Sequence, residues 1–234
     1  MSMSGCIEKF RLAGTEERPM NVVYFVLREY FHGKVLDVGC GQGRHLMLMP
    51  EDSVGIDLYP NKEMITKYGI VIHNLDNDLP FKNESFDVLF CSHLLEHIKS
   101  PYNMLKEFYR CLKPEGTLII GIPNSNCIYF DFYGLSKESD WSEHLYEWNL
   151  KQAIRFITNC GFEVEDTCCN FPFSKRFGKI WVSLPLVKRI SADLWFIATK
   201  KGEKIYLKPS KRNLLEKMLR KLFGNAMSQS SDEK

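Results

Sequence analysis

The sequence lacks any hydrophobic run that could cross a membrane, because none approaches the roughly 18 apolar residues that a bilayer span requires. Its first residues also lack a basic region followed by an apolar one, which is the pattern of a secretory signal. The eight cysteines are scattered and form no C-x-x-C pair, so we expect reduced, mostly buried thiols and not disulfides. Together these absences favour a cytoplasmic location.

The body of the chain has no excess of positive charge. Residues 1–199 hold 21 basic and 25 acidic residues, whereas residues 200–221 hold nine basic and two acidic ones. An enzyme that binds nucleic acid is typically basic on its catalytic face, so the acidic body argues against a nucleic-acid partner. At 234 residues, we expect one domain over residues 1–200 and an appended tail over residues 201–234.

The tail carries a helical pattern of its own. From Asn213 onward, leucine, methionine and phenylalanine alternate with Lys217, Arg220 and Lys221. A basic amphipathic helix of this kind can lie on an anionic membrane surface, which would give peripheral membrane contact. The alternative, which we favour, is a helix packed on its own domain with its basic side in solvent.

The strongest motif is the stretch VLDVGCGQGRHL, residues 35–46. It reads as an apolar strand, a turn with Gly39, Gly41 and Gly43 at alternate positions, and the start of a helix. Glycine lets the chain reverse sharply and brings bare backbone N–H groups against a ligand. The stretch therefore predicts a loop that holds a nucleotide-type cofactor.

Around this motif, apolar runs of strand length alternate with amphipathic runs of helix length. Strands are predicted over residues 34–38, 53–58, 70–74, 86–92, 117–122, 162–167 and 194–200. Helices are predicted over residues 21–31, 61–68, 101–112 and 150–160, with a further one beginning within 43–49. This order predicts an α/β fold with a doubly wound, mostly parallel seven-stranded sheet and helices on both faces. Two irregular insertions interrupt it, at about residues 124–148 and 171–190.

Two residues indicate which cofactor the loop would hold. A dinucleotide loop has the pattern G-x-G-x-x-G, and here Arg44 stands in place of its third glycine. Because that glycine permits close packing of the helix on the strand, its absence argues against NAD or FAD. Asp57 lies at the end of the second expected strand, where its carboxylate can accept hydrogen bonds from ribose hydroxyls.

At this point the sequence resembles the class I S-adenosylmethionine-dependent methyltransferases, over residues 35–124. The segments that carry the resemblance are DVGCGQG at 37–43, VGID at 54–57, NLDNDLPF at 74–81 with SFDV at 85–88, CSHLLEHI at 91–98 and LKPEGT at 112–117. The nearest group is the ubiquinone- and menaquinone-biosynthesis-like small-molecule methyltransferases. The resemblance implies a Rossmann-like methyltransferase fold, S-adenosyl-L-methionine as cofactor and a methyltransferase activity.

The resemblance also implies where the cofactor would lie. The loop with Gly39, Cys40, Gly41 and Gly43 would pass along its methionine part, and Asp37 would organise the loop amides or face the ammonium group. The ribose and adenine contacts would come from Asp57, Leu58, Leu75 and Asp76, and Ser92 would lie near the sulfonium.

The acceptor side has two candidate catalytic residues. His93 follows the fourth expected strand, and His144 lies in the segment EHLYEW just before an expected helix, where related methyltransferases place a histidine near the acceptor. Either could take a proton from an oxygen or nitrogen acceptor. The non-catalytic alternatives are a structural loop histidine for His93 and a surface histidine beside aromatic residues for His144. Those aromatic residues, between 129 and 148, would form either a lid or a satellite core.

The segment 93–97 also spells H-x-x-E-H, which on a helix in certain proteases binds zinc. Some quinone-pathway O-methyltransferases that look similar carry a metal-binding E-x-x-E-H here, with glutamate where this chain has His93. We therefore expect Glu96 and His97 to tie the start of the helix to the loop, and no metal.

These observations predict a methyltransferase whose acceptor is a small molecule, a glycan or a lipid-type intermediate, methylated on oxygen. Two alternatives stay open. The first is a catalytically silent protein that binds S-adenosylmethionine as a regulator or scaffold. The second is an RNA or protein methyltransferase, to which the acidic body gives little support.

Overall fold

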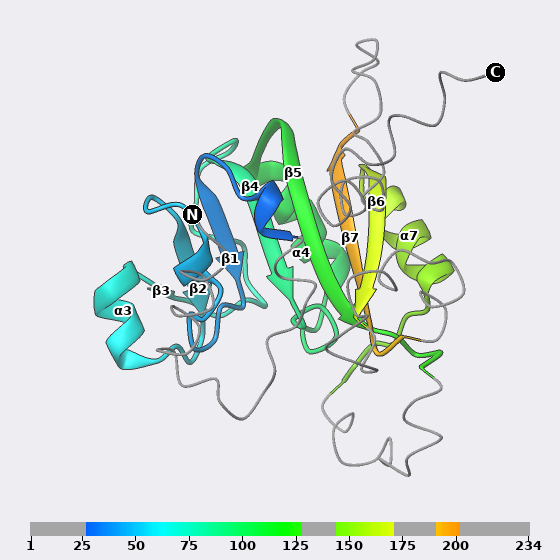
Figure 1. Cartoon of the computed structure of the whole chain (residues 1–234), viewed down its shortest axis with the longest axis horizontal. Helices are drawn as coiled ribbons and strands as arrows, with labels where there is room; N and C mark the ends of the chain where they lie inside the picture. Colours follow the sequence, from blue (N-terminus) through cyan, green and yellow to red (C-terminus); the bar gives the residue numbers. More distant parts are fainter. Residues whose placement is uncertain (1–26, 128–143, 171–190, 202–234) are drawn as a thin grey trace, which may run out of the picture.

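A single sheet organises the computed structural model, which describes residues 27–127, 144–170 and 191–201. Its seven strands lie in the order β3-β2-β1-β4-β5-β7-β6 (Figure 1). In chain order they are β1 (Val35–Val38), β2 (Val54–Asp57), β3 (Val71–Ile72), β4 (Phe86–Ser92), β5 (Leu112–Pro123), β6 (Phe162–Asn170) and β7 (Asp193–Lys200). The predicted seven-stranded α/β sheet is confirmed.

The strand directions are mostly parallel, as predicted. β1 pairs in parallel with β2 and β4, β2 with β3, and β4 with β5. Only β7 runs antiparallel to its neighbours β5 and β6. The carboxyl ends of β1, β2, β4 and β5 therefore meet at one edge of the sheet, where α/β proteins bind ligands.

Both faces of the sheet are covered. On one face, α4 (Pro101–Cys111) and α7 (Leu150–Asn159) pack on a core that includes Leu89 and Ile120. On the other, the 3₁₀ turns η1 (Arg28–Tyr30) and η2 (Leu46–Leu48) and the helix α3 (Lys62–Tyr68) pack on a second core. In Figure 1, α3 lies beside β2 and β3 at one side of the molecule and α7 beside β6 at the other.

Local sequence explains why α4 and α7 begin where they do. Ser100 accepts a hydrogen bond from the N–H of Asn103, and Pro101 occupies the first helical position, where a missing N–H is harmless. Asn149 and Gln152 form a reciprocal capping box at the start of α7. Each start satisfies backbone groups that a helix terminus leaves without an internal partner.

Several predicted elements differ from the structure. The sixth strand runs on to Asn170, past its predicted end at 167, and the described end of the helix predicted over 21–31 is only the 3₁₀ turn η1. The helix expected to begin within residues 43–49 is wrong, because the chain makes only the 3₁₀ turn η2 before Pro50, and the residue before a proline disfavours helical geometry. The third strand is shorter than predicted, since the Asn74 side chain accepts from the N–H of Asp76 and turns the chain. The fifth begins earlier, at Leu112, whose backbone pairs with Phe86.

The two insertions begin and end beside one another at the carboxyl edge of β5. The backbone N–H of Asn124 donates to Ala192 at 2.8 Å, and its side chain donates to Ser191 at 2.9 Å. The N–H of Ser125 donates to the carbonyl of Trp148 at 3.0 Å. The described ends of both insertions therefore lie at the edge where the ligand is expected.

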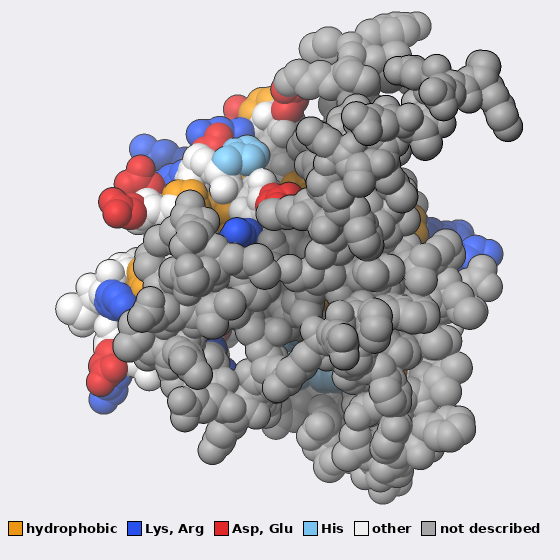
Figure 2. Space-filling model, viewed as in Figure 1, with side chains coloured by type: hydrophobic (Ala, Val, Ile, Leu, Met, Phe, Trp, Pro, Cys, Tyr) orange, Lys and Arg blue, Asp and Glu red, His pale blue; other side chains and the backbone are white. Residues whose placement is uncertain are grey.

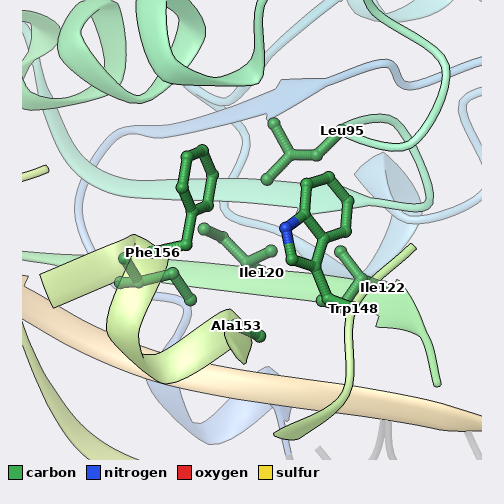
Figure 3. Close-up of a pocket in the computed structure, with 7 residues that line it drawn as sticks. Leu95, Ile120, Ile122, Trp148, Ala153 and Phe156 are labelled. Carbon is green, nitrogen blue, oxygen red and sulfur yellow. The ribbon is translucent and has the colours of Figure 1, made fainter. Parts of the chain in front are cut away.

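Aromatic side chains pack the segment before α7 against the sheet. Trp148 stacks on Phe156 of α7, with ring centroids 5.7 Å apart. Figure 3 shows both rings over Ile120 and Ile122 of β5, with Leu95 at the far side of the small apolar gap between them. This packing fixes residues 144–148 against the loop that follows β4.

Several predictions fall outside the described residues. They are the start of the helix at 21–31, the aromatic lid over most of 128–143, the insertion 171–190 and the basic tail from 202 onward. Among the helices that the structure describes, none is long and apolar enough to span a bilayer.

Candidate active site

The loop after β1 has the backbone geometry that its glycines predict. Gly39, Gly41 and Gly43 have φ values of +74°, +48° and +67°, a region that other residues rarely adopt. The backbone N–H of Gly39 donates to Ile56 of β2 at 2.9 Å, and that of Gly43 donates to Cys40 at 2.8 Å. Neighbouring strands and the loop itself thus fix this left-handed path.

Only one of these glycines faces open space. A β-carbon at Gly39 would come within 3.1 Å of Leu94, and one at Gly43 within 3.3 Å of Met64. At Gly41 it would meet no atom of the described residues within 4 Å. This open space leaves room for a ligand to pass along the loop at Gly41.

Asp57, at the end of β2, braces this loop. Its carboxylate accepts hydrogen bonds from the N–H groups of Gly41 and Tyr59, both at 2.8 Å. The side chain is only half-buried, and each oxygen keeps a second lone pair. The carboxylate can therefore hold the loop and accept hydrogen bonds from a ligand at the same time. Leu58, the next residue, is 39% exposed.

Asp37 lies beneath the loop and is completely buried. Neither of its oxygens has a hydrogen-bond partner among the described residues. Burial, with the nearby charge of Asp57 adding to it, raises the pKa of Asp37 to about 8. Such a site is costly for a carboxylate unless a cation reaches it.

The residue nearest to Asp37 does not supply that cation. His45 Nδ1 lies 3.8 Å from Asp37 Oδ2. Burial, followed by the charges of His93 and Arg44, lowers the pKa of His45 to about 4, so its ring is neutral near pH 7. The contact is therefore not an ion pair, and Asp37 keeps the capacity to bind a positively charged group.

Three other predicted cofactor residues lie around this loop. Cys40 points its thiol into the core, where a β-carbon at Gly55 would come within 2.8 Å of the sulfur, so only its backbone lines the loop. Leu75 is buried. Asp76 accepts from the backbone N–H of Lys99 at 3.0 Å and pairs with its ammonium at 3.3 Å. These contacts hold Asp76 to the segment before α4, and its contact with adenine stays a prediction.

His93, which the sequence predicts on the acceptor side, follows Ser92 directly at the end of β4. Its backbone is left-handed, with a φ of +51°, which is uncommon for a residue other than glycine. Its Nδ1 lies 3.4 Å from Glu96 Oε1, and its Nε2 lies 3.7 Å from Asp193 Oδ1. Burial by itself lowers the pKa of His93, but the hydrogen bond to Glu96 and the charges of Asp193 and Glu96 raise it above its ordinary value.

His144 reaches the same region from the segment before α7. Its ring lies edge-on to that of His97, with centroids 4.7 Å apart. The N–H of Leu145 donates to the carbonyl of Glu96 at 2.7 Å. The structure thus brings both predicted catalytic histidines to Glu96. Asp193 was missed, because nothing in its local sequence distinguishes it from a turn residue at the start of a strand.

Comparison with known proteins agrees with this geometry. Residues 36–120, from β1 to β5, match the family model described as a methyltransferase domain. The chain carries a class I S-adenosylmethionine-dependent methyltransferase domain. The matched segment contains the glycine loop, Asp57 and the histidine that follows β4.

Relatives of this methyltransferase domain differ in their acceptors. The chain is 32% identical over 131 residues to the tRNA U34 carboxymethyltransferase of Sulfurimonas denitrificans, covering 47% of this chain and 44% of that protein. It is 32% identical over 110 residues to the ubiquinone biosynthesis O-methyltransferase of Haemophilus ducreyi, covering 40% and 47%. The chain thus spans less than half the length of these two relatives.

Solved structures share the fold of the methyltransferase domain. One is a chain of the complex between the Haloferax volcanii Trm112 methyltransferase activator and a methyltransferase, with a TM-score of 0.61 and 17% identity over 86% of this chain and 97% of that one. A SAM-dependent methyltransferase from Archaeoglobus fulgidus has a TM-score of 0.54 and 22% identity, over 76% and 93%. At these identities the likeness concerns the fold.

The groups of the methyltransferase domain fit S-adenosylmethionine. The amino-acid part of S-adenosylmethionine carries an ammonium group, for which the buried, unpaired carboxyl of Asp37 is a suitable partner. Its ribose carries hydroxyls, which Asp57 can accept. The open space above Gly41 leaves room for the backbone of the loop to approach the ligand closely.

Replacing Gly41 with alanine tests the role of this open space. We expect a loss of about 10-fold or more in affinity for S-adenosylmethionine, because the methyl group occupies ligand space, together with about 1–2 kcal/mol of backbone strain. Gly69→Ala is the matched control, since Gly69 also has a positive φ, +61°, and open space around it, but caps α3 outside the loop. Calorimetric titration of both variants measures the difference. Equal affinities would show that the space above Gly41 is not ligand space.

Proposed function

We propose that the chain is an enzyme that transfers the methyl group of S-adenosylmethionine to a hydroxyl group of its acceptor, with His93 removing the hydroxyl proton. The observation that carries this proposal is the setting of His93. Its imidazole follows the end of β4, stands on a strained left-handed backbone and lies between the carboxylates of Glu96 and Asp193. Glu84 and Glu115 share the left-handed backbone but are exposed, whereas His93 combines it with two carboxylate contacts, a combination that functional sites favour.

The chemistry asks little covalent work of the protein, because the cofactor supplies a methyl group that is already activated for transfer. The chain has to hold the acceptor in line with that group and exclude water. An acceptor hydroxyl also has to lose its proton, and a positioned imidazole typically speeds such a step 10²–10⁴-fold. Glu96 and Asp193 would orient the His93 ring and stabilise the positive charge that it gains.

We propose a small molecule, a glycan or a lipid-type intermediate as the acceptor. The likeness to a ubiquinone biosynthesis O-methyltransferase supports a small acceptor with a hydroxyl group. Acidic and basic side chains are interspersed on the described part of the face in Figure 2, which is not the single-sign surface that nucleic-acid binding favours.

An RNA acceptor is the second candidate. The likeness to tRNA U34 carboxymethyltransferases supports it, since several such relatives match over 102–133 residues. The nine basic residues between positions 200 and 221, eight of them in the tail, would supply phosphate contacts in that case.

The acceptor class is tested by incubating the protein and S-adenosylmethionine carrying a labelled methyl group with the small-molecule, lipid, RNA and protein fractions of a cell extract. We expect label in the small-molecule or lipid fraction. Label in RNA would establish the second candidate. Label in protein, or in no fraction while the cofactor binds, would contradict both and favour a protein acceptor or a catalytically silent scaffold.

The role of His93 is tested by replacing it with glutamine. We expect kcat to fall by about 10²–10⁴-fold, because the variant has no group to take the proton. Cofactor affinity should change little, since the described polar contacts of His93 are with Glu96 and Asp193, which lie outside the glycine loop. His32→Gln, an exposed histidine before β1, is the control. A variant with wild-type kcat would remove His93 from the reaction.

A further inference from the structure

A second polar cluster lies beside His93, which contacts one of its members, Glu96. One ligand-type atom from each of Glu96, His97 and His144 lies within 4.8 Å of the others. Glu96 is 1% exposed, His144 is half-buried, and His97 is exposed at the mouth of the cluster. Two imidazoles and one carboxylate thus converge from two segments that are 47 residues apart in sequence.

Glu96 gives this cluster a need for positive charge. Both of its carboxylate oxygens are shielded from solvent, and among the described residues the hydrogen bond from His93 to one of them is long and poorly aligned. His93 approaches one oxygen at 3.4 Å, which leaves the other available. A buried carboxylate is stable when it is paired with a cation or binds a metal.

The types of ligand select the metal. Imidazole nitrogens favour zinc, iron, nickel and copper, whereas magnesium and calcium prefer sites built of oxygens. A zinc ion bound at about 2.0–2.2 Å holds its ligand atoms roughly 3.4 Å apart in tetrahedral geometry. Side-chain rotations that move each ligand atom by about 1 Å would bring the three atoms to that spacing. Three protein ligands would leave a coordination position open to water or another oxygen.

We propose that Glu96, His97 and His144 bind a divalent transition-metal ion of the zinc class. The expectation of no metal rested on residues 93–97 alone, and the third ligand, His144, comes from a distant part of the chain. The ligand set also leaves out His93, which occupies the first position of the H-x-x-E-H pattern.

The metal would cross-link the loop after β4 to the segment before α7. Two hydrogen bonds already join them, from Leu145 N to the Glu96 carbonyl at 2.7 Å and from the Tyr146 hydroxyl to the Lys99 carbonyl at 2.7 Å. Ordering the end of a long connection has an entropic cost, which metal binding would offset. The site needs no methyl transfer to form, so its test is independent of the proposed function.

The test uses the full chain, reduced and stripped of metal, titrated with Co²⁺ and followed by absorption, which separates nitrogen and oxygen ligation from binding by thiolates. Zn²⁺ titrated by calorimetry gives the affinity. We expect one site with nitrogen and oxygen ligation, weakened at least about 100-fold in Glu96→Gln, His97→Ala and His144→Ala. His32→Ala and His73→Ala, outside the cluster, should bind like the wild type.

Circular dichroism checks that each variant is folded, and Glu96→Gln preserves the volume of the side chain if the alanine variants are unstable. Absence of Co²⁺ binding by the wild type would overturn the proposal, as would thiolate ligation alone. Metal binding by the three cluster variants that is as tight as that of the wild type would also overturn it. Mg²⁺ is included, and a preference for it over Zn²⁺ would contradict the class of metal.

Discussion

Replacing Asp57 with alanine is expected to lower the affinity for S-adenosylmethionine by about 10²–10⁴-fold. Hydrogen bonds to a charged carboxylate contribute about 1.5–3 kcal/mol each, and the ribose offers two hydroxyls, which gives about 3–6 kcal/mol. Each 1.4 kcal/mol corresponds to about a factor of ten in affinity. The same substitution removes the acceptor for the N–H of Gly41, so the loop loses its brace as well.

The measurement is a calorimetric titration of the reduced full chain with S-adenosylmethionine. Asp52→Ala is the control, because Asp52 is an exposed carboxylate just before β2 and touches neither the loop nor β1 pairing. A melting curve of each variant separates a lost contact from a lost fold. If Asp57→Ala binds as tightly as Asp52→Ala, the ribose contact assigned to Asp57 is wrong.

Replacing Asp37 with asparagine is expected to stabilise the ligand-free chain at alkaline pH while it weakens cofactor binding. The folded chain holds the pKa of Asp37 at about 8, against an ordinary value of 3.8. Between about pH 4 and pH 8 the unfolded chain therefore ionises this carboxyl while the folded chain keeps it protonated. Stability is present below pH 4 and declines as the pH rises toward 8, by up to about 1.4 kcal/mol per unit.

Asparagine removes this pH dependence because it does not titrate. Between pH 5 and pH 8.5 we expect the stability of Asp37→Asn relative to the wild type to rise by on the order of 4 kcal/mol, because the wild type loses about 1.4 kcal/mol per pH unit up to about pH 8. For a domain of this size, each kcal/mol raises Tm by about 2–4 °C. Melting curves at the two pH values measure the effect. A wild type whose stability does not fall between pH 5 and pH 8.5 relative to the variant would contradict the buried, unpaired carboxyl.

The cofactor should reverse the protonation of Asp37. An ammonium group that reaches this carboxyl favours its ionised form, so binding near pH 7 should release about one proton. Titrations in buffers of different ionisation enthalpy count that proton, and Asp37→Asn should release none. Because Asp37 is fully buried, we expect the loop above it to move as the ammonium approaches.

Local sequence patterns were enough to predict the fold and the cofactor side of the site. The glycines at 39, 41 and 43 need left-handed backbone wherever they stand, and the structure gives all three a positive φ. Asp57 ends a strand that must lie beside β1, so its place near the loop followed from topology. The element that failed, the helix after the loop, was decided by Pro50 and not by periodicity.

The acceptor side depended on contacts that local patterns do not contain. Glu96 and His144 lie 48 positions apart, and their meeting is fixed by the hydrogen bond from Leu145 and the stacking of Trp148 on Phe156. Asp193 reaches His93 only because β7 inserts antiparallel beside β5. A distant contact also affects Asp76, which the sequence predicted to contact adenine. Its carboxylate already accepts a hydrogen bond from the backbone N–H of Lys99, 23 residues away.

The central claim is that the loop after β1 holds S-adenosylmethionine. Titration of the full chain with S-adenosylmethionine, S-adenosylhomocysteine and NAD tests it most directly. We predict one site that binds both sulfur-containing nucleosides and does not bind NAD, because Arg44 replaces the glycine that a dinucleotide loop requires. Binding of NAD, or no binding of either S-adenosyl compound by the folded chain, would contradict the account.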